Sequence, residues 1–334
     1  MRWFRGVLTL FGVAAAAISA SGFENPVWPR NWPDPTVWRA DDGYYYSFAT
    51  PGPGRHGLIR SRDFFKWESS GKDPFTPDTW RKLHDGWRNI WAPDVAKIGG
   101  KWLMYVTVYN SAEDCAVAVL SSFKPAGPFE YRGIVTKSRD TKIRDTIDPE
   151  AVVDPGTGKV WLFFGSVGKI HRVELARDGL ALAPGAKYVH VAGLTDRENP
   201  SREKVFEGSY LYRHNGYWYL FASAGRFSDE SYRIVVGRSR TLDGEFIDKH
   251  GNPMTRGFAE PLLWSERGDA FYGPGHNGEI FTLNNGRSYL VYHCHWREKD
   301  RPGSRPRVMM VQEIRWDKSG WPYIEGNHPA AVVK

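Results

Sequence analysis

Three acidic side chains stand in short motifs that are far apart along the chain: Asp34 in WPDPTV, Asp148 in TIDPEAVVD and Glu207 in VFEGSY. Carboxyl groups that are forced together titrate apart, so one stays ionised while another keeps its proton near neutral pH. One carboxylate can then activate water while a carboxylic acid protonates a departing oxygen, which is the chemistry of glycoside hydrolysis. The three acids can act in this way only if the fold brings them to one place.

An internal repeat indicates how the fold could bring them together. Five segments have the same design: a polar leading residue, a turn with glycine and an aromatic strand, as in DPTVWRADDGYYYSFAT. The leading residues are 60, 54, 59 and 69 residues apart, and a turn glycine follows them after 9, 6, 10, 9 and 10 residues. The leading residues are Asp34, Asp94, Asp148, Glu207 and His276, and the glycines are Gly43, Gly100, Gly158, Gly216 and Gly286.

These hairpins predict an all-β fold, a five-bladed β-propeller formed as a single domain by residues 22–334. The first strand of each blade lines the central channel of a propeller. Residues at one offset in each repeat should therefore point to the same end of that channel, and we expect the five leading residues to gather there. Polar residues in such strands also bind backbone or water, and Asp94 in WAPDV is the first candidate for that structural role.

Several neighbours of these acids are candidates for contact with a sugar. Aromatic residues make up 15% of the chain, and indole faces stack well on sugar rings. Trp32 and Trp91 lie within three residues of Asp34 and Asp94, although tryptophans also serve as core residues. The predicted substrate-binding residues are Trp32, Trp91, Asp94, Phe206, Ser166 and His276.

The N-terminal residues predict export. Arg2 and Arg5 precede an apolar run from Gly6 to Ile18 and then small residues, which is typical of a secretory signal peptide over residues 1–21. A secreted or periplasmic protein is therefore expected, without a membrane span in its mature part. Cys115 and Cys294 could form one disulfide or remain as two buried thiols.

The formal net charge of +7 does not predict nucleic-acid binding. The densest basic segment, Arg297–Arg307, is interrupted by Glu298 and Asp300 and matches no reader motif. We interpret it as a solvated loop.

The motifs around Asp34, Asp94, Asp148 and Glu207 resemble those of glycoside hydrolase family 43, from Asn25 to about Ile324. Members of this family are five-bladed propellers that cleave arabinans, xylans and related side chains with inversion. The resemblance implies Asp34 as general base, Glu207 as general acid and Asp148 as the residue that tunes the acid. It implies no cofactor for the chemistry.

Within that family, YRIVVGRSRTLDGEFIDKHGNPM and FYGPGHN resemble arabinan-degrading members. This implies hydrolysis of arabinose-containing polysaccharides or oligosaccharides, of the arabinan or arabinoxylan type. It also implies that His276 lies near Ca²⁺ or another structural ion in the channel, although a histidine that binds only water fits the sequence equally. Two segments depart from the pattern: FGSVGKIHRVELA would remodel the sugar sites, and the charged LTDRENPSREK would close one end of the cleft and favour exo action.

Two alternatives stay open. A β-xylosidase or β-galactosidase-type member of the same family would have the same acids. A non-catalytic carbohydrate-binding propeller would keep the tryptophans but would not need a base and an acid on different blades. The linkage preference and the oligomeric state are not predicted.

Overall fold

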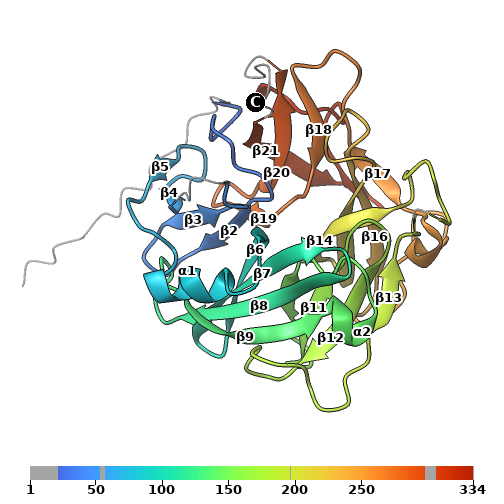
Figure 1. Ribbon diagram of the computed structural model, residues 1–334. Helices are drawn as coiled ribbons and strands as arrows, with labels where there is room; N and C mark the ends of the chain where they lie inside the picture. Colours follow the sequence, from blue (N-terminus) through green and yellow to red (C-terminus); the bar gives the residue numbers. More distant parts are fainter. Residues whose placement is uncertain (1–21, 53–56, 196, 298–305, 334) are drawn as a thin grey trace, which may run out of the picture.

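The computed structural model describes residues 22–52, 57–195, 197–297 and 306–333. Its strands form five antiparallel sheets that surround a central channel, which is the predicted five-bladed β-propeller (Figure 1). The predicted signal peptide, residues 1–21, lies outside the described residues. Within the described residues, no helix is both long and apolar enough to span a membrane.

Each of the first three blades is a four-stranded meander whose strands pair in chain order. Blade I contains β2 (Thr36–Arg39), β3 (Tyr45–Phe48), β4 (Ile59–Ser61) and β5 (Glu68–Ser69). Blade II contains β6 (Asn89–Ile98), β7 (Lys101–Ser111), β8 (Asp114–Ser122) and β9 (Glu130–Lys137). Blade III contains β10 (Glu150–Val153), β11 (Val160–Phe164), β12 (Ile170–Leu175) and β13 (Val189–Ala192).

The last two blades follow the same plan. Blade IV contains β14 (Phe206–His214), β15 (Tyr217–Ala224), β16 (Arg233–Ser239) and β17 (Glu260–Leu263). Blade V contains β18 (Phe271–Gly275), β19 (Ile280–Thr282), β20 (Ser288–Trp296), β21 (Arg307–Trp316) and β22 (Pro322–Tyr323). Because β18 and β19 pair with the two ends of β20, they are two halves of one inner strand. The short helices are α1 (Pro77–Leu83), α2 (Ser138–Thr141) and the 3₁₀ turn η1 (Met254–Arg256).

The two ends of the described chain meet and close the ring. β1 (Phe23–Glu24) pairs with β23 (Val332–Val333). Next to this pair, the buried amide of Asn25 donates to the carbonyls of Val311 and Ala330, at 2.8 and 2.9 Å. The Asn25 Oδ1 atom accepts from the Val311 N–H at 3.0 Å. The first residues of the propeller therefore bind to its last blade.

Packing between blades repeats five times. Five buried apolar clusters lie at the five interfaces between neighbouring blades, including the one between blades V and I. Flat, β-branched and aromatic side chains suit these faces because they cover a pleated sheet well. Cys115 and Cys294 are both buried and unpaired. The five predicted turn glycines, Gly43, Gly100, Gly158, Gly216 and Gly286, all have φ between 70 and 81°, where an L side chain is strained.

In the inner strand of every blade, or within two residues of it, a residue with left-handed φ stands at the matching position of the repeat, and these five residues form what we call the mouth ring. Their φ angles lie between 42 and 57°. In four of the five, the backbone N–H donates to a side chain on the second strand, or just beyond it, of the preceding blade. The mouth ring consists of Asp34, Ala92, Asp148, Gly208 and His276.

The mouth ring corrects the predicted alignment of the repeats in blade II. Ala92, not Asp94, is the counterpart of Asp34 and Asp148. Asp94 lies two residues further along β6, and its Oδ2 atom accepts from the N–H of Ala151 on blade III at 2.9 Å. The side chain of Asp94 therefore joins two blades, which is the structural role that WAPDV suggests. It does not line the active-site pocket, so the predicted contact of Asp94 with a sugar does not form.

Asp94 belongs to a second set of side chains, the channel ring, which links the inner strands of blades II, III, IV, V and I in that order. Glu150 accepts from the Leu211 N–H at 2.6 Å, and the Tyr210 hydroxyl accepts from the Ile280 N–H at 3.1 Å. Glu279 links blade V to blade I because it accepts from the Val37 N–H at 2.6 Å and from Thr36 Oγ1 at 2.8 Å. The channel ring consists of Thr36, Asp94, Glu150, Tyr210 and Glu279.

The channel ring should make stability depend on pH. Burial, and then the charge of Asp94, raises the pKa of Glu279 to about 8, whereas an unfolded glutamate titrates near 4.3. The folded state thus binds an extra proton between these values, and this stabilisation is lost as the pH rises through the folded pKa. Each pH unit between these two pKa values costs about 1.4 kcal/mol, so we expect the free energy of unfolding to fall by roughly 3–4 kcal/mol between pH 5 and 8.5. Glu279→Gln should reduce this fall in urea titrations, whereas the exposed Glu325→Gln should not; an equal fall in all three proteins would contradict the prediction.

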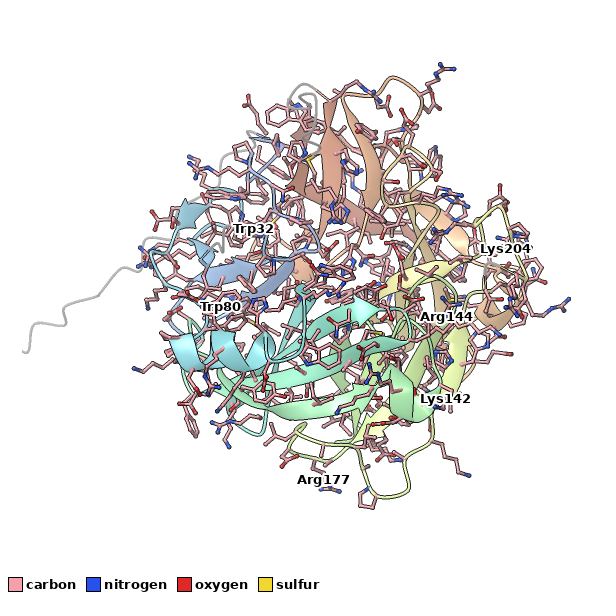
Figure 2. The ribbon with its side chains drawn as sticks, in the orientation of Figure 1. Trp32, Trp80, Lys142, Arg144, Arg177 and Lys204 are labelled. Carbon is pink, nitrogen blue, oxygen red and sulfur yellow. The ribbon has the colours of Figure 1, made fainter. Side chains whose placement is uncertain are left out.

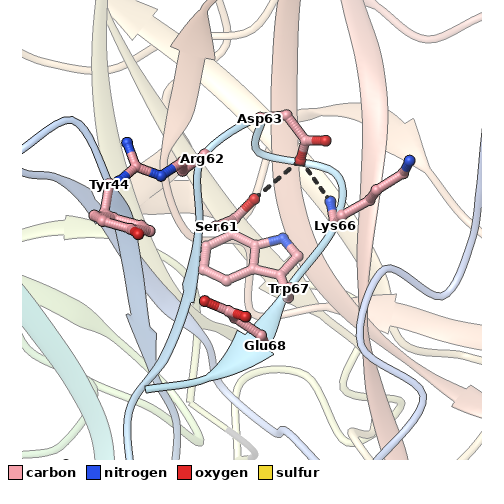
Figure 3. Close-up of a pocket in the computed structure, with 7 residues that line it drawn as sticks. All are labelled: Tyr44, Ser61, Arg62, Asp63, Lys66, Trp67 and Glu68. Carbon is pink, nitrogen blue, oxygen red and sulfur yellow. Dashed lines mark hydrogen bonds between the residues drawn. The ribbon is translucent and has the colours of Figure 1, made fainter.

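A small pocket on the edge of blade I is lined by the segment RSRDFFKWE, residues 60–68, and shows how this segment folds (Figure 3). The Oδ1 atom of Asp63 accepts from Ser61 Oγ at 3.1 Å and from the Lys66 N–H at 2.7 Å. These bonds fix the turn that leads from β4 to β5, with Trp67 and Glu68 on the wall of the pocket. Because the Asp63 carboxylate binds groups of its own turn, we interpret this pocket as part of the scaffold.

Candidate active site

One pocket, with a volume of about 380 Å³, opens at the mouth ring and receives all three predicted catalytic acids. Asp34 comes from the start of blade I, Asp148 from blade III and Glu207 from blade IV. Asp34 and Asp148 belong to the mouth ring, and Glu207 directly precedes its Gly208 member, so the break in each inner strand turns the side chain into the pocket. The remaining lining residues are Thr50, Trp91, Tyr109, Asp145, Ile147, Ser166, Val167, Arg202, Phe227, Tyr232, His276 and Arg307.

Asp34 is held as an ionised carboxylate. Its Oδ1 atom accepts from Arg307 at 2.9 Å, and its Oδ2 atom accepts from Thr50 Oγ1 at 2.6 Å. Burial by itself raises the pKa of Asp34, but the Arg307 charge, His276, His293 and the Thr50 hydroxyl bring it below its usual range. Burial also lowers the pKa of both histidines, which keeps them neutral. Arg307 is therefore the charge that matters most, and Asp34 is suited to accept a proton from water.

Removing Arg307 should move the acid limb of the pH–rate profile. In Arg307→Met, burial acts on Asp34 without the compensating charge, so the pKa of Asp34 rises and the ionised base is lost at a higher pH. A neighbouring arginine lowers an aspartate pKa by about 1–3 units, and we expect the acid limb of kcat/KM to shift upward by a similar amount. Arg297→Met is the control because Arg297 pairs with exposed Glu230. An unchanged acid limb in Arg307→Met would refute this role.

Asp148 has the opposite tendency. Burial first, then the negative charges of Glu207, Asp34 and Asp145, raise the pKa of Asp148 well above its usual value, while a bond from the Gly208 N–H opposes them. Asp148 therefore keeps its proton at a pH where an aspartate in water would lose it.

Two hydroxyl groups fix the position of Glu207. Ser166 Oγ donates to Glu207 Oε2 at 2.5 Å, and the Tyr232 hydroxyl donates to Oε1 at 2.7 Å. Ser166 follows the second strand of blade III. At this position in the other four blades, a side chain accepts a hydrogen bond from the N–H of the mouth-ring residue of the next blade. In this blade the hydroxyl binds Glu207 instead, and the Gly208 N–H is used by Asp148. The fivefold pattern is thus broken at the acid pair.

An aromatic wall faces these acids. Trp91 is partly exposed in the pocket, where it stacks on Tyr109 with ring centroids 4.3 Å apart. Phe227 is 53% exposed on the rim, with the Arg307 guanidinium 5.5 Å from its ring centroid. Flat apolar faces beside charged groups are suited to bind a sugar ring, which has both apolar C–H faces and hydroxyls.

Two predicted sugar contacts do not form, because their side chains belong to the core. Trp32 is 2% exposed in the cluster between blades V and I, and its indole N–H donates to Ser47 Oγ at 2.9 Å. Phe206 is 1% exposed in the cluster between blades III and IV. Along an extended strand, neighbouring residues point to opposite faces, so Phe206 points into the core where Glu207 points into the pocket.

Comparison with known proteins agrees with this geometry. The model of Glycosyl hydrolases family 43 matches residues 23–322. The chain belongs to glycoside hydrolase family 43. It is therefore a glycosidase of an inverting family, as the motifs indicated.

Individual relatives cover most of this family 43 chain. The extracellular exo-α-(1→5)-L-arabinofuranosidase of Cellvibrio japonicus is 30% identical over 311 residues, 87% of this chain and 86% of its own. A probable arabinan endo-1,5-α-L-arabinosidase C of Aspergillus flavus is 31% identical over 302 residues, 86% of this chain and 88% of its own. The structure of a Cellvibrio cellulosa α-L-arabinanase complexed with arabinohexaose superimposes with a TM-score of 0.73 at 27% identity, covering 88% of this chain and 95% of that one.

The sequence motifs did not predict the side chains that position the acids of this family 43 protein. Arg307 was assigned to a solvated loop; residues 298–305 of that segment lie outside the described residues, but Arg307 begins β21 and reaches Asp34. Thr50 lies just after β3 in no distinctive motif, and Tyr232 opens the YRIVVGRSR segment, which the motifs did not link to the acids. Asp145 carried one usable signal, because IRDTIDPE places a second aspartate three residues before Asp148.

The predicted ion site at His276 has few protein ligands. His276 lines the pocket with its Nδ1 atom 3.5 Å from Asp34 Oδ1, and its neutral imidazole could serve as one ligand. In the part of the chain that the structure describes, no three His, Cys, Asp or Glu side chains converge as a metal site. An ion beside His276 would therefore be held mainly by water, and the acid–base steps derived below use protein groups alone.

Proposed function

We propose that this protein hydrolyses arabinose-containing polysaccharides or oligosaccharides, of the arabinan type, with inversion at the anomeric carbon. The observation that carries the proposal is the convergence of three acids on one pocket of a family 43 propeller, with the pKa of Asp34 lowered and that of Asp148 raised. A binding module without catalysis has no need for an ionised carboxylate and a proton-retaining carboxyl group in one sugar-sized pocket. The relatives named above supply the expected substrate class.

In the proposed mechanism, Asp34 removes a proton from the attacking water as the water oxygen bonds to the anomeric carbon. The glycosidic C–O bond breaks on the opposite side, and Glu207 gives its proton to the departing oxygen. After the products leave, Asp34 gives its proton to solvent and Glu207 takes one up from solvent. Asp148 keeps its own proton and so limits the negative charge beside Glu207. Ser166 and Tyr232 hold Glu207 at the leaving oxygen, while Arg307 keeps Asp34 ionised.

One panel of substrates tests the proposal. Linear arabinan, an aryl α-L-arabinofuranoside and an aryl β-D-xyloside are compared, and the first-formed product anomer is followed by proton NMR. Arabinan or the arabinofuranoside should be the best substrate, with the inverted anomer formed first. Sizing the products of arabinan separates exo from endo action. Preference for the xyloside, a retained anomer or no hydrolysis of any substrate would refute the proposal.

The extracellular relatives also support secretion, which we propose for this protein with residues 1–21 as the leader. Expression of the full chain in a bacterial host and N-terminal sequencing of the exported product test this. Residues beginning close to Gly22 are expected at the mature N-terminus, and retention of the leader in the product would contradict it.

A further inference from the structure

A second pocket adjoins the active-site pocket and carries an excess of positive charge. Its volume is about 470 Å³, and it shares Asp145, Ser166 and Val167 with the active-site pocket. The two pockets are therefore parts of one depression. A ligand that fills both would extend from the three acids across Ser166 into the second pocket.

Three loops supply the cations of this second pocket. Lys142 and Arg144 follow α2, as Figure 2 shows, Lys169 ends the turn after β11, and Arg197 lies in the loop before β14. The turn after β11 requires glycine at 165, where φ is 132° and a Cβ atom would lie 2.2 Å from the Lys169 carbonyl oxygen. This tight turn returns the chain so that Ser166 and Lys169 line the same pocket.

The cations outnumber the acids that line the pocket. Four lining side chains are cationic, namely Lys142, Arg144, Lys169 and Arg197, and the only acidic one among the described lining residues is Asp145. Three of the cations have partners outside the pocket: Arg144 lies 2.9 Å from Glu113, Lys169 lies 3.4 Å from Glu198, and Lys142 Nζ donates to the Arg139 carbonyl at 2.9 Å.

These two ion pairs leave the cations able to bind a ligand. Both members of the Arg144–Glu113 pair are about two-thirds exposed, and exposed pairs add little stability. An arginine also has five N–H donors, so it can hold a second anion while keeping the first.

Polar groups next to the cations are suited to sugar hydroxyls. His171 lines the same pocket, and its Nδ1 atom lies 3.1 Å from the Lys169 carbonyl oxygen. Burial, then His190 and the Lys169 charge, lower the pKa of His171 to about 4, so this imidazole is neutral near pH 7. The charge of the pocket therefore comes from its lysines and arginines, and His171 adds a neutral hydrogen-bonding group.

We propose that this second pocket binds an anionic sugar residue, one that bears a carboxylate or a sulfate ester, next to the neutral sugar that is cleaved. The inference rests on the proposed glycosidase function, because the pocket is continuous with the active site. Loop cations that surround a sugar-sized hollow favour an acidic substituent over a neutral one, and they raise the local concentration of acidic polymers. The substrate would then be an arabinose-containing chain close to an acidic sugar.

The test compares oligosaccharides of equal length that are neutral, uronate-bearing or sulfated. For wild type we expect kcat/KM to be about tenfold higher for at least one acidic substrate than for the neutral one, with the uronate and sulfate arms showing which anion is preferred. This preference should shrink towards unity in 0.5 M NaCl, because salt screens charges. Arg144→Gln/Lys169→Gln should lose most of it.

The matched control is Arg81→Gln/Lys82→Gln, which removes the same charge from α1, where both residues pair with Asp78. It should keep the preference of wild type. No preference in wild type, or an equal loss in both double variants, would overturn the proposed anion site.

Failure of the proposed function can be distinguished from failure of the anion site. Absence of hydrolysis of the neutral arabino-oligosaccharide by wild type would count against the function alone. Calorimetry on the Glu207→Gln variant measures the binding of acidic and neutral oligosaccharides without turnover. Tighter binding of an acidic ligand at low salt would support the anion site, and equal binding of both would refute it.

Discussion

The Asp34→Asn variant should lose roughly three to four orders of magnitude in kcat, while its affinity for a product oligosaccharide changes little. Asparagine keeps the shape of the side chain. Its Oδ1 atom can still accept from Arg307 and its amide N–H can donate to Thr50 Oγ1, so the pocket should remain folded. It cannot accept a proton from water. The loss should therefore be in the chemical step and not in binding, which steady-state kinetics and calorimetry separate.

Added azide provides a sharper test of Asp34. Azide is a nucleophile that needs no deprotonation, so it should restore part of the turnover of Asp34→Asn on an aryl glycoside and form a glycosyl azide. The exposed Asp41→Asn is the control, because Asp41 pairs with Lys97 on the surface. Wild-type turnover in Asp34→Asn would remove Asp34 from the mechanism.

The Glu207→Gln variant should lose a similar factor on arabinan or arabino-oligosaccharides, whose leaving group is a sugar hydroxyl. Glutamine cannot give up a proton, although its oxygen can accept from one of the Ser166 and Tyr232 hydroxyls while its amide N–H donates to the other. A dinitrophenyl glycoside leaves as a stable anion and needs no proton. We therefore expect this variant to keep much more of its rate on the dinitrophenyl substrate than on the oligosaccharide.

The pH dependence gives a second readout for Glu207. Loss of the acid should remove the alkaline limb of the pH–rate profile, while the acid limb set by Asp34 stays. An equal loss on both substrates, with both limbs unchanged, would indicate that Glu207 only positions the substrate. Glu203→Gln, an exposed neighbour on the same loop, is the control and should behave as wild type.

Much of this site could be predicted from sequence because its acids are attached to a repeat. The turn glycines identified five hairpins, and the register of those hairpins placed Asp34, Asp148 and Glu207 at one end of a channel. The mistake in blade II had a visible warning. Asp94 precedes its glycine by only 6 residues, whereas Ala92, the true counterpart, precedes it by 8, close to the spacing elsewhere.

The groups that tune the acids could not be predicted in the same way. Arg307 reaches Asp34 from the last blade, so their proximity is set by the closure of the ring. Tyr232 precedes the third strand of the blade that carries Glu207, so their proximity is set by the folding of that blade and not by local spacing. Trp32 and Phe206 lie next to catalytic acids in the sequence but are buried in the core. Proximity in sequence to a catalytic acid therefore does not decide whether a side chain faces the pocket or the core. Two pockets that share one serine could be recognised only in three dimensions.

The pairing of β1 with β23, and the binding of Asn25 to the last blade, have a consequence for biosynthesis. The segment synthesised first has its binding partner among the residues synthesised last, so translation must deliver residues up to about 333 before the circle can be completed. A chain that is still emerging from the ribosome cannot finish this fold. Such a delay would suit passage through a translocation pore as an unfolded polypeptide, with assembly completed on the far side.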